Sequence, residues 1–443
     1  MFKLIKMTIL SIKSVKISDR KYCLVMLIAI VLMLCNTSCG RSPKTQVMVP
    51  LNKVDYSARN IRVESDNILN IQTDFSAPTY ELDIPAIVEK SSVDTLIKSY
   101  HFIPLETTEE SMIGNISKLF AFHGTIAVLD FRQKKAFLFD KNGKFKCTLG
   151  HIGRGPGEYL SISDLSVDTE GNRIVLLDGE SNKLQYYSPD GDFLEERSTY
   201  WYFDNLEFDG SNLVMNTRRA NPPGTLFYRY QIVVSDSLQI PLARGFLETE
   251  DAQSNFYFEP TLIHSPRGIF CDDLLSDTLW RIRGTLRIPF AVVRKDGLPT
   301  FSEDEIKHIS SKLYHQRTIE HDHAGNYCIS NNYLYMNIKG NKQHFGGPDA
   351  VTGLLYSLNS KQQKRFGCQR TNNSRLGDFL FYSYFNFFFE GDSFCNVIQP
   401  NDILDVAQYD DVQNVMTPEE KSMVKALTPE SNPVLMIMEP VDF

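Results

Sequence analysis

One pattern recurs in the first half of the chain at a fixed spacing. The segment IAVLD at Ile126–Asp130 recurs as IVLLD at Ile174–Asp178. The segment FLFDKNGKF that begins at Phe137 recurs as QYYSPDGDF, beginning at Gln185. Three matched pairs are each 48 residues apart: Asp130 and Asp178, Gly143 and Gly191, and Phe145 and Phe193. Three offsets of one value predict a repeated structural unit.

Each unit contains the elements of a small antiparallel sheet. An apolar strand ends in Asp, and a second strand leads through Asn-Gly or Asp-Gly into a third. These dipeptides are typical of tight hairpins, in which both central residues take positive φ. A fourth strand fits before each unit, at residues 116–122 and 165–168. Four strands in about 40–50 residues is the period of a propeller blade.

Later units are less regular but keep recognisable strands. They are marked by residues 209–215, 276–286, 333–338 and 353–358. The 20 Tyr, 29 Phe and 25 Gly residues suit many short strands with tight turns. Dividing residues 95–400 by the repeat length predicts an all-β fold, a six-bladed β-propeller of four-stranded antiparallel blades, covering residues 80–443 with a C-terminal closing segment.

Two short helical insertions are expected at the rim of the propeller. Ser302–Glu305 has the pattern of a capping box, which would begin a helix over residues 306–316. Thr417–Glu420 has the same pattern with Pro418 at the first helical position, and predicts a helix over residues 421–427.

The first 38 residues have the organisation of an export signal. Residues 1–22 carry six Lys and Arg against one acid, and are followed by an unbroken apolar run from Cys23 to Cys35. That run is shorter than the roughly 20 residues that a membrane-spanning helix needs. Small and polar residues then lead to Cys39. The pattern predicts a signal peptide over residues 1–38.

Cys39 resembles the lipidated cysteine of a bacterial lipobox, with Asn36 where Leu is usual. Membrane attachment through an N-terminal lipid is therefore expected, with simple secretion as the alternative. Residues 39–79 are then a tether and N-terminal extension. The tether has no acidic cluster of the kind that resembles a surface-export signal in such lipoproteins. This favours the outer membrane and a periplasm-facing position in the cell envelope.

The charge of the remaining chain excludes one class of partner. Without residues 1–38, the chain has 40 Lys and Arg against 53 Asp and Glu. Because nucleic-acid binding depends on neutralising phosphates with Lys and Arg, no nucleic-acid partner is expected. The five cysteines after Cys39 are scattered and show no zinc-binding spacing, although one or two disulfides remain open.

Several strings resemble a known group of proteins. FIPLETT at residues 102–108, GHIGRGPGEY at residues 150–159, SDTLW at residues 276–280 and NPVL at residues 432–435 are similar to segments of six-bladed β-propeller lipoproteins of Bacteroides-type bacteria, relatives of NHL-repeat propellers. The resemblance covers residues 80–443 and implies the fold without an activity. The NPVL segment could supply a strand that pairs with N-terminal sequence and closes the ring.

The loop at residues 150–159 is the first candidate ligand-binding site. In NHL-like propellers, such a segment crosses from the outer strand of one blade toward the axis. Arg154 and Glu158 would then lie near the channel mouth, with His151 and Tyr159 beside them. The alternative is that the glycines only permit a tight crossover and that Arg154 and Glu158 form a structural ion pair.

Three further features have structural explanations that we favour. Asp130 and Asp178 could form part of a carboxylate ring, but short Asp side chains also cap the turns that follow strands. His321 and His323 could suit a metal, although a solvated loop is expected and no metal site is predicted. The aromatic run at residues 379–389 could stack on sugars but suits a strand in the core.

No linear catalytic motif appears in the chain, and no cofactor is predicted. The favoured function is a non-enzymatic binding module for a glycan, a peptide or an envelope protein. One alternative is a metal-dependent hydrolase or lactonase-like enzyme, which requires Asp, Asn, Glu or His from at least three blades to converge at the axis. The other alternative is a structural scaffold of the envelope.

Overall fold

The computed structural model describes residues 68–84, 93–218, 220–221, 225–246, 262–272, 278–295, 323–339, 351–367 and 387–443. The chain divides into two compact units, Met1–Leu51 and Asn52–Phe443. The first unit, with the predicted signal peptide and Cys39, lies outside the described residues. Within the described residues, no helix is both long enough and apolar enough to cross a membrane.

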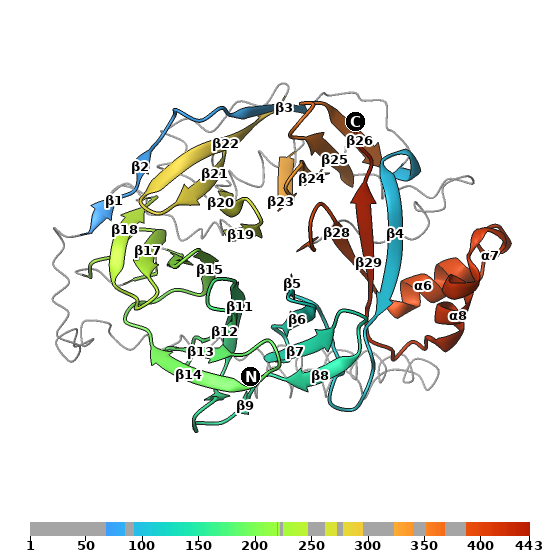
Figure 1. Ribbon diagram of the computed structural model, residues 1–443, viewed down its shortest axis with the longest axis horizontal. Helices are drawn as coiled ribbons and strands as arrows, with labels where there is room; N and C mark the ends of the chain where they lie inside the picture. Colours follow the sequence, from blue (N-terminus) through green and yellow to red (C-terminus); the bar gives the residue numbers. More distant parts are fainter. Residues whose placement is uncertain are drawn as a thin grey trace, which may run out of the picture. The chain divides into compact units, whose positions relative to one another are not determined.

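Six antiparallel sheets form a ring in the second unit, which confirms the predicted six-bladed β-propeller (Figure 1). Blade 1 contains β5 (Lys118–Phe122), β6 (Thr125–Asp130), β7 (Lys135–Asp140) and β8 (Phe145–Thr148). Blade 2 contains β11 (Ile162–Asp168), β12 (Arg173–Asp178), β13 (Lys183–Tyr187) and β14 (Phe193–Ser198). Blade 3 contains β15 (Asn205–Asp209), β16 (Asn212–Asn216), β17 (Ile232–Asp236) and β18 (Pro241–Gly245).

The remaining three blades follow in chain order. Blade 4 contains β19 (Leu262–Ser265), β20 (Gly268–Asp272), β21 (Thr278–Arg283) and β22 (Leu286–Lys295). Blade 5 contains β23 (His323–Ile329), β24 (Tyr333–Lys339), β25 (Val351–Ser357) and β26 (Gln363–Gly367). Blade 6 contains β27 (Phe387–Phe388), β28 (Phe394–Ile398), β29 (Val434–Pro440) and β4 (Ile97–Pro104), in that order from the inside.

In the part of the chain that the structure describes, the apolar core forms six clusters, one at each contact between neighbouring blades. Between blades 1 and 2, for example, Leu138 and Leu149 pack with Tyr159, Leu165 and Leu176. The last cluster joins blade 6 to blade 1 and includes residues of β4, β29 and β6. Because successive side chains of a strand point to opposite faces, the central strands are apolar on both faces and serve two clusters each.

The Asn-Gly and Asp-Gly turns differ in one respect from the expected geometry. Only the glycines have positive φ, 84° at Gly143 and 96° at Gly191. The register shifts in the strand before each turn, between Leu138 and Phe139 in blade 1. One residue of positive φ next to a β-bulge is the geometry of a hairpin with a three-residue loop. The prediction that both central residues have positive φ was therefore wrong.

Blade 6 closes the ring by combining the two ends of the propeller. β29 pairs antiparallel with β4, with Leu435 opposite Ile103, which confirms the predicted pairing of the NPVL segment with N-terminal sequence. Asn432 is buried, and its amide group accepts a hydrogen bond from the Ile113 backbone and donates to the carbonyls of Glu106 and Ser111. This side chain fixes the loop that joins β4 to blade 1.

Residues before β4 extend two other blades. β1 (Leu69–Asn70) pairs parallel with β18, and β2 (Gln72–Thr73) and β3 (Tyr80–Ile84) pair parallel with β22. A short 3-10 turn, Val93–Thr95, then precedes β4. Part of the N-terminal extension therefore covers the outer edges of blades 3 and 4.

Three helices are inserted in blade 6 between β28 and β29. They are α6 (Pro400–Ala407), α7 (Asp410–Val415) and α8 (Pro418–Ala426). The predicted capping box is confirmed at α8, where Thr417 and Glu420 each accept a hydrogen bond from the other's backbone. The sequence patterns did not indicate α6 and α7. The other expected helix, over residues 306–316, lies outside the described residues.

Candidate functional site

The loop at residues 150–159 does not reach the axis. Its two short strands, β9 (His151–Ile152) and β10 (Glu158–Tyr159), pair parallel with each other. β9 lies at the outer margin of the ring, beside β14 (Figure 1). The expectation that this loop lies near the channel mouth was therefore wrong, because the chain turns outward before it begins the innermost strand of blade 2.

Local contacts explain the residue types in this loop. The Glu158 carboxylate lies 2.7 Å from His151 Nε2 and accepts a hydrogen bond of 2.6 Å from the Gly155 backbone. The hydrogen bond from Gly155 and the contact with His151 lower the pKa of Glu158. Arg154 is exposed, and the expected ion pair with Glu158 is replaced by the contact with His151. A side chain at Gly153 would lie 2.0 Å from the Glu158 carboxylate.

Tyr159 has a core role. It is buried in the cluster between blades 1 and 2, and burial raises its pKa to about 12. His151 is 74% exposed, by contrast. These placements support the crossover interpretation of the glycines. Ligand binding by His151, Arg154, Glu158 and Tyr159 stays a prediction.

Asp130 and Asp178 cap turns, as the structural explanation predicted. Asp130 accepts hydrogen bonds from the backbones of Gly114, Asn115 and Gln133. Asp178 accepts hydrogen bonds from four backbone amides, those of residues 160, 161, 180 and 181. Both carboxylates are fully buried and directed at backbone amides, so they form no carboxylate ring.

Two other candidate segments lie largely outside the residues that the structure describes. His321 and Asp322 are not among the described residues, and neither are residues 379–386. In the part of the chain that the structure describes, no group of three or more His, Cys, Asp or Glu side chains is arranged to hold a metal ion. Cys147 and Cys395 are free thiols, and Cys368 lies outside the described residues.

A pocket of about 700 Å³ lies at the axis of the ring. Residues from the innermost strands of all six blades line it, so it is made by the propeller as a whole. Ser117, Ser163, Asp204 and Leu262 lie where these strands begin, which places the pocket toward that end of the axis.

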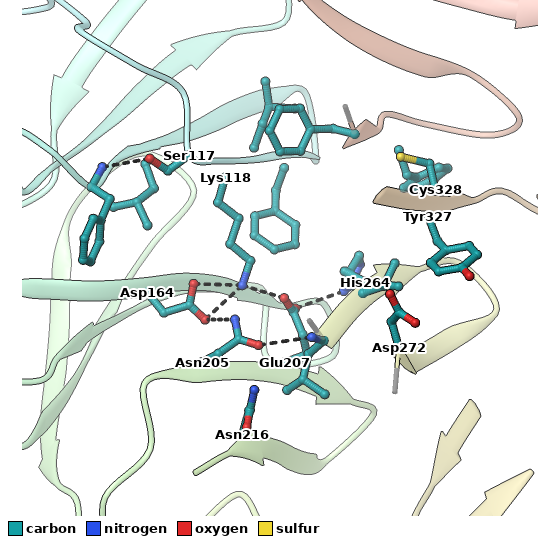
Figure 2. A pocket seen from close by; sticks show the side chains of 18 of the residues that line it. Ser117, Lys118, Asp164, Asn205, Glu207, Asn216, His264, Asp272, Tyr327 and Cys328 are labelled. Atoms are coloured by element: carbon teal, nitrogen blue, oxygen red, sulfur yellow. Dashed lines mark hydrogen bonds and ion pairs between the residues drawn. The ribbon is translucent and has the colours of Figure 1, made fainter. Parts of the chain in front are cut away.

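An ion network occupies the centre of this pocket (Figure 2). The Lys118 ammonium lies 2.9 and 3.0 Å from the two oxygens of Asp164 and 2.6 Å from Glu207 Oε1. The other Glu207 oxygen accepts a hydrogen bond from Ser166 and lies 3.4 Å from His264 Nδ1. The network thus joins side chains of blades 1 to 4.

Neutral donors hold the Asp164 carboxylate in place. Its Oδ2 atom accepts hydrogen bonds of 2.8 Å from Asn205 Nδ2 and from the Leu206 backbone. Phe120 lies beside the network, with its ring 5.4 Å from the Lys118 ammonium and 5.2 Å from the His264 ring. A buried ion pair is favourable only when its remaining lone pairs are satisfied in this way.

The pKa values of Asp164 and Glu207, which share the Lys118 ammonium, shift in opposite directions. Burial raises the pKa of Asp164 in spite of the Lys118 charge. Burial acts in the same direction on Glu207, but Lys118 and His264 outweigh it and lower its pKa. Burial alone would lower the pKa of Lys118, yet Asp164 and Glu207 raise it above its ordinary value. Lys118 therefore stays protonated at neutral pH.

The pocket has a polar side and an aromatic side. Blade 3 adds an ion pair between Asp204 and Arg218, and Asn205 and Asn216 lie beside it. Blade 4 adds Asp272 next to His264. Tyr327 from blade 5 and Phe387, Phe388 and Phe389 from blade 6 form the other side, with Phe120 and Phe131 from blade 1.

Comparisons with known proteins agree with this architecture. A model of the family described as a domain of unknown function, DUF4934, matches residues 79–439. The chain belongs to the DUF4934 family. A search of curated proteins finds no significant match for this DUF4934 member.

One solved structure shows that this fold recurs at low sequence identity. A Bacteroides fragilis protein that is inferred to be exported has 20% sequence identity and a TM-score of 0.66, and the match covers 82% of the DUF4934 chain and 100% of that chain. A member of the DUF4221 family from Bacteroides vulgatus has 11% identity and a TM-score of 0.45 over 78% of the DUF4934 chain and 97% of its own. The first similarity supports the fold alone.

The sequence patterns missed the residues of the axial pocket. Lys118, Asp164, Glu207 and His264 are spread over four strands and form no local motif. In the structure Lys118 and Asp164 hold equivalent positions, because they pair with Leu129 and Leu177, which are 48 residues apart. In the sequence of this DUF4934 chain they are only 46 residues apart, so the 48-residue repeat does not align them.

Proposed function

We propose that this protein is a lipid-anchored binding module of the bacterial cell envelope and that its ligand occupies the axial pocket. The observation that carries the proposal is a hollow of about 700 Å³ whose polar side chains come from several blades. This volume lies in the range of small-molecule sites, which combine an apolar lining with a few placed polar groups. A packed axis would have favoured the scaffold alternative.

The anchor rests on the N-terminal sequence. The basic segment, the apolar run and Cys39 form an export signal that ends in a lipid-accepting cysteine. The structural similarity to a Bacteroides protein inferred to be exported is consistent with this address. Intact-mass analysis of the mature protein should find a diacylated N-terminus at Cys39, and an unmodified Cys39 or cleavage elsewhere would refute the anchor.

The arrangement of charges favours binding over the metal-dependent hydrolase. That alternative requires convergent acidic and imidazole side chains, and Asp164, Glu207 and His264 do converge. However, the ammonium of Lys118 lies between the two carboxylates and forms an ion pair with each. Because Lys118 is held protonated, it is also a poor nucleophile. The centre of the pocket is therefore built as a fixed polar surface.

A binding screen tests the proposal. The full-length chain, purified in detergent, is heated with libraries of saccharides, short peptides and amines, and the melting temperature is followed. A true ligand raises the melting temperature of the wild-type chain. The same ligand should have little effect on Phe388→Ala, which alters the pocket, and an undiminished effect on Arg154→Ala, which alters the outer loop. The reverse result would refute the axial site.

A further inference from the structure

We infer that the axial pocket binds a neutral saccharide, with the hydroxyl groups on the polar side and an apolar ring face on the aromatic side. This inference rests on the proposed function, because it names the ligand class of the same pocket. The two sides of the pocket and its charge balance support it independently.

The polar side offers donors next to acceptors. The Lys118 ammonium lies beside the Asp164 carboxylate, and the Arg218 guanidinium lies beside Asp204. Asn205 and Asn216 add groups that both donate and accept. A hydroxyl group donates one hydrogen bond and accepts others, so a ligand with several adjacent hydroxyls matches alternating donors and acceptors. A purely apolar ligand would leave these charged groups covered and without water, which is costly.

Two aromatic side chains that line the pocket, Phe131 and Phe388, belong to none of the core clusters of the described residues. Phe387 and Phe389 pack against the core between blades 6 and 1. Phe388 lies between them in sequence, and alternation along the segment turns its side chain the other way. Phe131 also lines the pocket and is 54% exposed. Exposed aromatic side chains in a pocket are suited to cover the C–H face of a sugar ring.

The charge balance excludes one kind of saccharide. Among the described residues that line the pocket, four carry carboxylates, Asp164, Asp204, Glu207 and Asp272, and two carry permanent positive charges, Lys118 and Arg218. Both cations already contact carboxylates, so an additional anion would meet net repulsion. Uronic acids and sulfated sugars are therefore disfavoured relative to their neutral counterparts.

The experiment is calorimetric titration of the full-length chain in a detergent without a sugar head group. The probes are neutral mono- and disaccharides, each paired with the uronic acid of the same configuration. We expect at least one neutral saccharide to bind, and its uronic acid to bind at least tenfold more weakly. Asp204→Asn and Phe388→Ala should each weaken binding of the neutral sugar at least tenfold.

Matched controls distinguish an error in the saccharide assignment from an error in the axial site. Arg154→Ala lies outside the pocket and should bind as the wild type does, and the melting temperature of each variant verifies that it is folded. Preferential binding of acidic saccharides, or binding of peptides alone with the same dependence on Phe388, would overturn the saccharide assignment and leave the axial site intact. Neutral-sugar binding that Asp204→Asn and Phe388→Ala leave unchanged would overturn the axial site itself.

Discussion

At the scale of single residues, Lys118 is the cation of the axial ion network. Its ammonium pairs with two carboxylates, of which Glu207 is completely buried. Charges removed from water are tolerated only while they are paired. Sequence reasoning did not find this role, because Asp164 and Glu207 lie 46 and 89 residues away from Lys118 and no local pattern joins the three.

Replacing Lys118 by Met should lower the free energy of unfolding by about 3 kcal/mol, because two buried carboxylates lose their counter-charge. Urea denaturation measures the loss. The triple variant Lys118→Met, Asp164→Asn, Glu207→Gln keeps similar shapes without the charges and should recover most of the stability. If Lys118→Met were as stable as the wild type, the network would have no net electrostatic role.

The same lysine predicts a pH dependence. Its pKa is raised above the ordinary 10.5 in the folded protein. A raised pKa contributes stability that is fully present below the unfolded pKa and is lost as the pH rises through the folded pKa. The difference in melting temperature between wild type and Lys118→Met should therefore be constant from pH 8 to about pH 10 and shrink above it. A difference that grows with alkaline pH would contradict the raised pKa.

At the scale of elements, some turns could be predicted from the sequence and others could not. The Asn-Gly turn of blade 1 was predictable because Gly143 needs a positive φ. A second requirement for glycine at this position could not be predicted from the sequence. A Cβ atom at Gly143 would lie 2.3 Å from the carbonyl oxygen of Pro104, at the end of β4. The outer loop at residues 150–159 was misplaced for a similar reason. Its glycines indicate an unusual backbone but give no direction relative to the axis.

Substitutions at two glycines distinguish the cost of backbone strain from the cost of a steric clash. Gly124 also has positive φ, 75°, but a side chain there would meet nothing within 4 Å. Gly124→Ala should cost about 1 kcal/mol from backbone strain alone. Gly143→Ala should cost more, because strain and the clash with Pro104 add. Equal losses in thermal or chemical denaturation would show that β4 is not held tightly against this turn.

A substitution at Asn432 tests how much the hydrogen bonds at the start of the closing strand β29 contribute to stability. Asn432→Ala removes the partner of the Ile113 backbone N–H and of the Ser111 carbonyl, whereas the Glu106 carbonyl keeps the Ser111 hydroxyl as a donor. Each buried group left unsatisfied costs about 1–3 kcal/mol. We expect a loss of at least 2 kcal/mol in the free energy of unfolding. Asn142→Ala changes an exposed amide of the turn and should stay within about 0.5 kcal/mol of the wild type.

At the scale of the whole molecule, the six interblade clusters and the pocket both follow from closing the ring. The repeat period predicted the number of blades, because two regular units fix the length of one blade. It could not predict the pocket, which depends on polar residues that differ from blade to blade. Lys118, Asp164, Glu207 and His264 take unrelated identities at the axis, so no repeat pattern carries them.

Hydrogen–deuterium exchange with a ligand found in the screen tests the central claim most directly. If the ligand occupies the axial pocket, protection should increase in the innermost strands of several blades, including β5, β15 and β19, while the outer strands β8 and β14 stay unchanged. Protection confined to residues 150–159, or to the outer edge of one blade, would contradict an axial site.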